Sequence, residues 1–287
     1  MATEDGIIMD GKVVRDALLA GLRDQIMAAG TPAITLATVL VGDDGPSRKY
    51  VGSKHKQAQS IGMKSVGVDL PATATQAEVE SAVKNLVDDV AVHGILVQIP
   101  LPANLNEESV LDLLPAAKDV DGLTTASLGR LVRGIDGHIG CTPLGVMRLL
   151  EFYGITTSGK RAVVVGRSTL VGYPLSILLA RKGIDCTVTL AHSRTPNLAA
   201  VCREADILIS ATGMARSITS EFVKPGACVV DVGISRTESG IVGDVDFEAV
   251  KKVAGFVTPM PGGTGVMTVA CLLENTLSAA RMQGVAI

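Results

Sequence analysis

Apolar positions in this chain fall into short continuous runs that alternate with longer segments in which apolar residues recur at helical spacing. Continuous runs are typical of buried parallel strands, and helical segments between them are typical of βαβ units. In the first half of the chain, strands are predicted at 34–42, near 64–70 and in the apolar run 94–102, where two prolines end the strand in an irregular loop. Helices are predicted at 46–62, 75–92 and 107–114.

A second alternating series follows a segment rich in Gly, Asp and Pro at 134–145, where we place a domain boundary. Five strands with short connecting helices predict a doubly wound sheet there. The last helix, 265–283, is apolar on one face, which suits packing back on the first domain. The strands are predicted at 161–166, 186–191, 206–210, 227–233 and near 254–258, and the helices at 142–154 and 171–182.

The pattern therefore predicts an α/β chain of two domains. One comprises residues 1–141 with the returning C-terminal helix 269–287, and the other comprises residues 142–268 and is Rossmann-like. The composition agrees: of 287 residues, 47% are hydrophobic but only 2% are aromatic, and Trp is absent. A core built from Ala, Val, Leu and Ile favours buried parallel strands over an all-β sandwich.

Charge and cysteine content exclude several classes of protein. Lys and Arg number 26 against 29 Asp and Glu, so the chain lacks the basic footprint of a nucleic-acid-binding protein. No apolar run reaches the roughly 18 residues of a membrane helix, and the acidic start is unlike a secretory signal. Five scattered cysteines and four histidines form no CxxC or HExxH motif. We expect a cytoplasmic protein without a membrane, nucleic-acid or metal partner.

A glycine-containing turn at 163–172 (VVVGRSTLVG) suggests a nucleotide site. Gly166 and Gly172 follow a buried strand and open a helix, where backbone N–H groups and the helix dipole bind phosphate. The turn departs from the common GxGxxG pattern, and glycines in βα turns often serve backbone geometry alone.

The end of the next strand indicates which dinucleotide would bind. NAD enzymes usually place Asp or Glu there, about 20 residues on, to bind the ribose hydroxyls. This chain instead has His192, Ser193 and Arg194, which suit a 2′-phosphate because Arg forms charge-assisted, bidentate hydrogen bonds to phosphate. NADP is therefore favoured; a solvated loop end is the alternative.

Four residues of the first domain form a candidate catalytic group. Tyr50 and Lys54 are four residues apart on a predicted helix, so they share one face, although an ordinary surface helix would look the same. Gln98 interrupts an apolar strand end, and a buried amide needs a partner such as Lys54. Asp121 is a carboxylate in an apolar setting, unless it only forms a turn.

Nine ordered motifs together resemble the bifunctional methylenetetrahydrofolate dehydrogenase/methenyltetrahydrofolate cyclohydrolase family, over almost the whole chain. They are SRKYVGSKHK (47–56), GILVQIPLP (94–102), PAAKDVDGL (115–123), CTPLG (141–145), VVVGRSTLVGYP (163–174), VTLAHSRT (188–195), KPGACVVDVGISR (224–236), GDV (243–245) and TPMPGGTGVMT (258–268).

The resemblance implies a cytosolic homodimer with a folate cleft between a catalytic domain and an NADP-binding domain. It would oxidise 5,10-methylenetetrahydrofolate with NADP and hydrolyse the product to 10-formyltetrahydrofolate. Carried over by residue, Tyr50 stacks on the folate, Lys54 handles protons, Gln98 orients Lys54, and Asp121 binds the pterin. Other implied folate contacts are Val97, Pro100, Leu101, Pro261, Gly262 and Gly263. The implied NADP contacts are Gly166, Arg167, Ser168, Val171, Gly172, His192, Ser193, Arg194 and, at the nicotinamide, Ile234.

The chain departs from the family pattern at three places. Ile139-Gly140 precede the CTP turn where Pro is usual, and Thr264 and Val266 replace the common Val and Pro. These changes bear on loop rigidity more than on chemistry. Two alternatives stay open: a shikimate-dehydrogenase-like NADP oxidoreductase, which would not need Tyr50 or Gln98, and a non-catalytic nucleotide-binding protein, which would not need Lys54.

Overall fold

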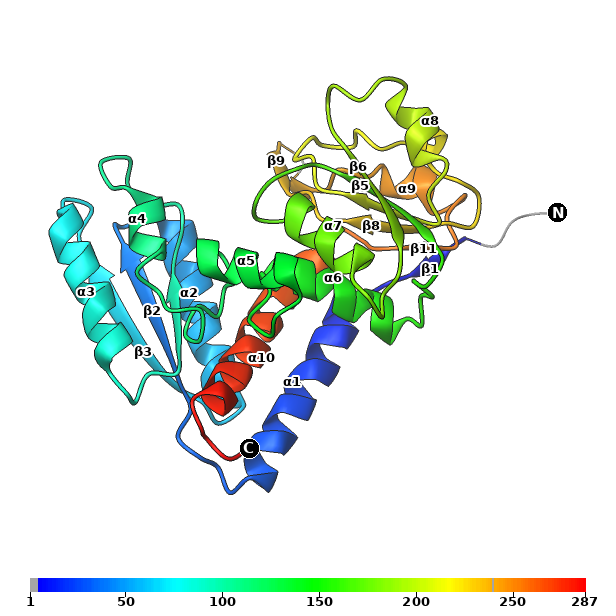
Figure 1. Ribbon diagram of the computed structural model, residues 1–287. Helices are drawn as coiled ribbons and strands as arrows, with labels where there is room; N and C mark the ends of the chain where they lie inside the picture. Colours follow the sequence, from blue (N-terminus) through cyan, green and yellow to red (C-terminus); the bar gives the residue numbers. More distant parts are fainter. Residues whose placement is uncertain (1–4, 239) are drawn as a thin grey trace. The chain divides into compact units, whose positions relative to one another are not determined.

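The computed structural model describes residues 5–238 and 240–287 and divides into two compact units (Figure 1). Unit 1 contains the residues up to Asp16 and Thr142–Thr268, and unit 2 contains Ala17–Cys141 and Val269–Ile287. No helix among these described residues has the length and apolar character needed to cross a membrane.

Unit 2 is built on a parallel sheet of three strands in the order β3-β2-β4. The predicted strands are confirmed: β2 is Thr35–Val41, β3 is Lys64–Leu70 and β4 is Gly94–Val97. All seven residues of β2 are buried, as expected for a central strand. The helices of this part of the chain are α1 (Gly11–Ala28), α2 (Gly45–Ser60), α3 (Gln76–Asp88), α4 (Glu107–Leu111), α5 (Thr125–Arg133) and, from Val269 on, α10 (Met267–Met282).

Unit 1 contains a parallel sheet in the order β1-β11-β8-β7-β5-β6. Alternate residues of β5, such as Val163 and Val164, enter two separate apolar clusters. One cluster includes residues of α6 and α7, and the other includes residues of α8 and α9, so the predicted doubly wound arrangement is confirmed. The elements are β1 (Ile7–Ile8), α6 (Cys141–Phe152), β5 (Arg161–Val165), α7 (Gly172–Ala180), β6 (Thr187–Ala191), α8 (Leu198–Cys202), β7 (Ile207–Ser210), β8 (Cys228–Asp231), α9 (Phe247–Val250) and β11 (Phe256–Val257).

The start of the chain differs from the predicted domain boundaries, which placed it in the N-terminal domain. Strand β1 pairs in parallel with β11, with Ile7 opposite Phe256, so it forms the sixth strand of the unit 1 sheet. A strand of two residues has no periodicity that sequence patterning detects. The same holds for the small hairpin of β9 (Ser235–Thr237) and β10 (Gly240–Val242) and for the 3₁₀ turns η1 (Ser220–Phe222) and η2 (Thr264–Val266).

One buried amide ties helix α10 to the segment between α4 and α5 and to the segment after α5. The side chain of Asn275 donates 2.8 Å hydrogen bonds to the carbonyl oxygens of both Val120 and Ile139. Because buried carbonyls lose water on folding, this amide compensates two groups at once. The predicted docking of the last helix on the first domain is thus specific as well as apolar.

We expect Asn275→Ala to destabilise the protein by about 2 kcal/mol, because two buried acceptors lose their donor. Urea denaturation measures this loss. Ser278→Ala, a substitution on the same helix, is the control, since the Ser278 hydroxyl makes no hydrogen bond with any of the described residues. Equal stability of the two variants would contradict the assigned role of the amide.

Candidate active site and cofactor site

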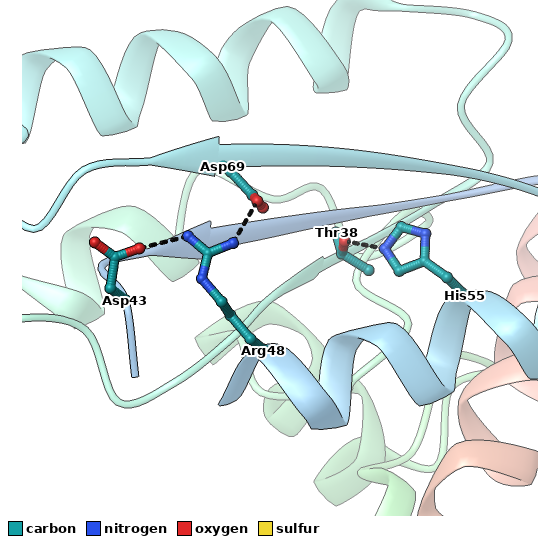
Figure 2. Close-up of polar contacts among 5 residues, drawn as sticks. All are labelled: Thr38, Asp43, Arg48, His55 and Asp69. Carbon is teal, nitrogen blue, oxygen red and sulfur yellow. Dashed lines mark hydrogen bonds and ion pairs between the residues drawn. The ribbon is translucent and has the colours of Figure 1, made fainter. Parts of the chain in front are cut away.

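Two side chains of helix α2, Arg48 and His55, make the polar contacts drawn in Figure 2. Arg48 forms ion pairs with Asp43 at 2.6 Å and with Asp69 of β3 at 3.0 Å. About two turns further along α2, the ring Nε2 of His55 lies 2.8 Å from the hydroxyl of Thr38 on β2. These contacts set the position of the helix that carries Tyr50 and Lys54.

Lys54 is the buried cation of this helix. Its side chain is only 6% exposed, and its Nζ donates to Oε1 of Gln98 at 3.0 Å. The same Nζ lies 4.6 Å from the centre of the Tyr50 ring, within cation–π range. Gln98 in turn donates to the carbonyl of Ile99 at 2.8 Å, which fixes which amide atom faces the amine. The partner expected for Gln98 is therefore present, and Tyr50, Lys54 and Gln98 form one group.

The pKa values of Lys54 and Asp121 are shifted toward each other by burial. Loss of water lowers the pKa of Lys54, and the negative charge of Asp121 raises it again in part. Burial raises the pKa of Asp121, and Lys54 and a hydrogen bond with Cys141 lower it. The amine is thus easier to deprotonate than an ordinary lysine, which favours a role in proton transfer.

The two aspartates of KDVDG have different roles. Asp119 is buried, and its carboxylate accepts hydrogen bonds from the N–H groups of Gly122 and Thr124, both at 2.9 Å, and from the Ser127 hydroxyl at 2.6 Å. Asp119 therefore fixes the turn, and this turn presents Asp121. Sequence reasoning missed Asp119, although it is the first carboxylate of the KDVDG motif and was therefore a visible signal.

The other implied folate residues of unit 2 are placed differently from one another. The side chains of Val97 and Leu101 pack in the same apolar cluster as Val110, and the Leu101 N–H donates to the Glu107 carboxylate at 2.9 Å. Pro100 between them is exposed. Substrate contact through the Val97 and Leu101 side chains is thus not supported by the structure.

The remaining implied folate residues, Pro261, Gly262 and Gly263, belong to unit 1. Gly262 has a φ of +109°, which L residues rarely adopt, and its carbonyl accepts from the Gly11 N–H at 2.8 Å. A Cβ on Gly263 would lie 2.5 Å from the Pro259 carbonyl oxygen. Both glycines are required by the backbone of this loop, so the stretch is more than a stiff linker.

A cavity of about 520 Å³ lies at the carboxyl ends of β5, β6 and β7 in unit 1. This edge is where open α/β sheets bind nucleotides. None of the described residues that line it is acidic, which suits a phosphate-bearing ligand. The lining residues are Val165, Gly166, Arg167, Ser168, His192, Ser193, Leu198, Ala211, Thr212, Met214, Ser217, Ile218 and Phe222.

The glycines of the predicted phosphate turn are both sterically required. Gly166 has a φ of +126°, and a Cβ there would lie 2.3 Å from the Ala211 carbonyl oxygen. A Cβ on Gly172 would lie 2.0 Å from the carbonyl oxygen of Gly166. At the start of α7, Val171 offers no side-chain cap; its own N–H donates to the Ser168 hydroxyl oxygen at 3.2 Å, and the Tyr173 N–H donates to the Ser168 carbonyl at 3.1 Å. Ser168 therefore holds the turn against the N-terminal end of the helix, the end whose dipole favours an anion. These observations fit a dinucleotide phosphate at this turn.

The residues after β6 form an ordered loop beside the cavity. The backbone N–H of Arg194 donates to Nδ1 of His192 at 3.2 Å, which orients the imidazole. His192 and Ser193 line the cavity, whereas Arg194 is exposed and Ile234 is 58% exposed, and neither contributes to the lining. Sequence reasoning missed the loop after β7, which supplies Thr212, Met214 and Ser217 but carries no recognisable motif.

Comparison with known families gives two matches that together cover most of the chain. Residues 9–121 match the family described as tetrahydrofolate dehydrogenase/cyclohydrolase, catalytic domain. Residues 140–284 match the family described as tetrahydrofolate dehydrogenase/cyclohydrolase, NAD(P)-binding domain. Bifunctional protein FolD 2 of Frankia alni is 50% identical over 278 residues, which are 96% of both chains.

Two solved structures are similar over nearly their whole length. The bifunctional methylenetetrahydrofolate dehydrogenase/cyclohydrolase FolD of Campylobacter jejuni is 42% identical with a TM-score of 0.92, covering 96% of this chain and 98% of that one. The FolD of Trypanosoma brucei, complexed with NADP cofactor and inhibitor, is 35% identical with a TM-score of 0.90, covering 97% and 98%.

The mutual effect of Lys54 and Asp121 on their pKa values is testable. Lys54→Met removes the positive charge that lowers the pKa of Asp121, so we expect that pKa to rise. Carboxyl ¹³C NMR titration of the labelled protein measures it. Lys56→Met removes an exposed cation of the same helix and should leave the pKa of Asp121 unchanged. An Asp121 pKa unchanged by Lys54→Met would show that the two groups do not interact.

Proposed function

This chain belongs to the tetrahydrofolate dehydrogenase/cyclohydrolase family, and on that premise we propose that it oxidises 5,10-methylenetetrahydrofolate with NADP and hydrolyses the resulting 5,10-methenyltetrahydrofolate to 10-formyltetrahydrofolate. The observation that carries the proposal is the buried Lys54 amine, hydrogen-bonded to Gln98 and placed against the Tyr50 ring. No observation favours a shikimate-dehydrogenase-like activity or a non-catalytic nucleotide-binding role.

The protein contributes mainly positioning to the oxidation. Bound NADP supplies the hydride acceptor. Tyr50 offers an aromatic face for a flat ring, and the residue is 40% exposed, so a ligand has access to it. Asp121 is the carboxylate placed to hold the pterin. Because the methylene carbon is flanked by two nitrogens, correct orientation accounts for most of the help this step requires.

Hydrolysis requires proton movement, and Lys54 is the group placed for it. Water oxygen bonds to the methenyl carbon while one of its protons passes to the unprotonated amine of Lys54. The bond from this carbon to N5 then breaks, its electron pair goes to N5, and the Lys54 ammonium returns a proton there. The second proton of the added water leaves to solvent as the formyl carbonyl forms. Gln98 keeps the amine in place through both transfers.

For the cofactor we propose that the cavity beside Gly166 binds NADP, with Arg167, Ser168 and Ser193 near its phosphates. Arg194 is exposed on the loop that follows β6, and it comes directly after His192 and Ser193, which line the cavity. Its guanidinium is therefore free to turn toward a 2′-phosphate. The absence of a carboxylate among the described lining residues supports NADP over NAD.

We further propose a cytoplasmic homodimer. All five cysteines are buried free thiols, which suits a reducing compartment. Strand β3 lies at the edge of the unit 2 sheet and pairs only with β2 among the described strands. Its Val66 side chain is 44% exposed. An unpaired edge with an exposed apolar residue suits contact with a second copy of the chain.

Lys54→Met should reduce hydrolysis of supplied 5,10-methenyltetrahydrofolate, without NADP, to near the uncatalysed rate, a loss on the order of 10²–10⁴-fold. Some dehydrogenase activity should survive, because hydride transfer needs no side-chain base. Gln98→Ala should follow the same pattern, and the exposed Lys56→Met should not. Near-normal hydrolysis by Lys54→Met would contradict the mechanism.

Arg194→Ala should weaken NADP binding about 10- to 100-fold, the effect of losing hydrogen bonds to a charged group, while NAD binding changes little. Isothermal titration with each nucleotide measures both affinities. Lys182→Ala, which removes another exposed cation of unit 1, is the control. Equal loss for NADP and NAD would show that Arg194 does not contact the 2′-phosphate.

A further inference from the structure

We propose that Asp244 is a positioning residue for dinucleotide binding: its buried carboxylate fixes the loop 211–218, which forms one wall of the unit 1 cavity. This inference rests on the proposed NADP-dependent function. The loop supplies five of the residues that line the cavity, namely Ala211, Thr212, Met214, Ser217 and Ile218.

The Asp244 side chain fixes the beginning of this loop. It is fully buried, and its Oδ2 accepts hydrogen bonds from the N–H groups of Thr212 at 2.6 Å and Gly213 at 3.3 Å. The hydroxyl of Ser210, at the end of β7, donates to the same oxygen at 2.9 Å. A carboxylate oxygen is the strongest acceptor available for two adjacent backbone donors.

The backbone around Asp244 fixes the end of the loop. The N–H of Arg216 donates to the Gly243 carbonyl at 3.0 Å, and the N–H of Ile218 donates to the Asp244 carbonyl at 2.9 Å. Arg216 has a φ of +52°, a conformation that a non-glycine residue adopts only when its surroundings impose it. The segment 243–244 therefore holds both ends of the loop.

Asp244 is itself held by a second buried carboxylate. Asp231 accepts hydrogen bonds from the N–H groups of Gly233, Asp244 and Val245, each at 3.0 Å. The Thr264 hydroxyl donates to the Asp231 carbonyl at 2.7 Å. At Thr264, where the family commonly has Val, the extra hydroxyl therefore adds a hydrogen bond to this support.

The space around the Asp244 carboxylate is limited on one side by Gly233. A Cβ on Gly233 would lie 1.9 Å from Oδ1 of Asp244, and that oxygen has no hydrogen-bond partner within the described residues. Gly233 is not among the positive-φ glycines, so its φ does not require glycine, and the Asp244 carboxylate is what an added Cβ meets first. Gly233→Ala should therefore displace the carboxylate while retaining it chemically. This substitution perturbs the loop without deleting the acceptor.

The consequence is specific to the cofactor. If Oδ2 is lost or displaced, two backbone donors are left unpaired and the loop loses the conformation that shapes the cavity wall. NADP affinity falls, while hydrolysis of 5,10-methenyltetrahydrofolate without NADP has no need of this cavity. A general loss of folded protein would instead reduce both activities together.

The test compares Asp244→Ala, Asp244→Asn and Gly233→Ala in the full-length enzyme. We expect Asp244→Ala and Gly233→Ala to raise the KM for NADP and its Kd by titration calorimetry roughly tenfold or more, with dehydrogenase kcat at saturating NADP and NADP-free hydrolysis retained. Asp244→Asn keeps an oxygen for Thr212 and Gly213 and should restore much of the affinity. Asp246→Asn, a change at the neighbouring cap of α9, is the matched control.

Three outcomes decide the question. Unchanged NADP affinity in Gly233→Ala or Asp244→Ala overturns the inference, as does a parallel fall of both activities in folded Gly233→Ala. If Asp244→Ala does not fold, Gly233→Ala and Asp244→Asn still give the result. Failure of the wild-type enzyme to bind NADP would overturn the proposed function instead, which separates the two.

Discussion

The arrangement of unit 2 depends on the cost of burying one amine. A lysine ammonium removed from water is unfavourable unless other groups replace the lost hydration. In this protein the replacements are an amide oxygen of Gln98, the face of Tyr50 and the charge of Asp121. Gln98 follows β4, Tyr50 lies on α2 with Lys54, and Asp121 lies between α4 and α5. The buried amine is therefore accommodated only where these separate segments are packed together.

The surrounding contacts hold these three groups in position around the amine. Arg48 and His55 fix α2 on the sheet, Asp119 fixes the turn that carries Asp121, and Asn275 ties that turn to α10. None of these four side chains touches Lys54 through a hydrogen bond in the described residues. Their effect on chemistry is through position, since a proton-transfer group is effective only within hydrogen-bond reach of its target.

The sequence predicted long, strongly patterned elements and failed on short or locally ambiguous ones. Strand β3 matched its predicted range because Val66, Val68 and Leu70 recur at every second position, which is the period of a strand. Strand β1 is only two residues long and exists through pairing with β11. In the site, the Lys54–Gln98 contact was predicted because a buried amide needs a partner, whereas the different roles of Asp119 and Asp121 depend on burial that their shared motif does not encode.

The central claim is that buried Lys54, in its unprotonated form, moves the proton during hydrolysis. Its pKa lies below the ordinary 10.5 because of burial and is raised in part by Asp121. The most direct test is the pH dependence of kcat for NADP-free hydrolysis, corrected for the uncatalysed rate, in the wild type and in Asp121→Asn. We predict that kcat rises with pH and that the midpoint of the rise lies below 10.5. In Asp121→Asn the midpoint should move to lower pH, because the charge that raises the pKa of Lys54 is gone. A midpoint that stays in place or moves to higher pH in Asp121→Asn would contradict the account.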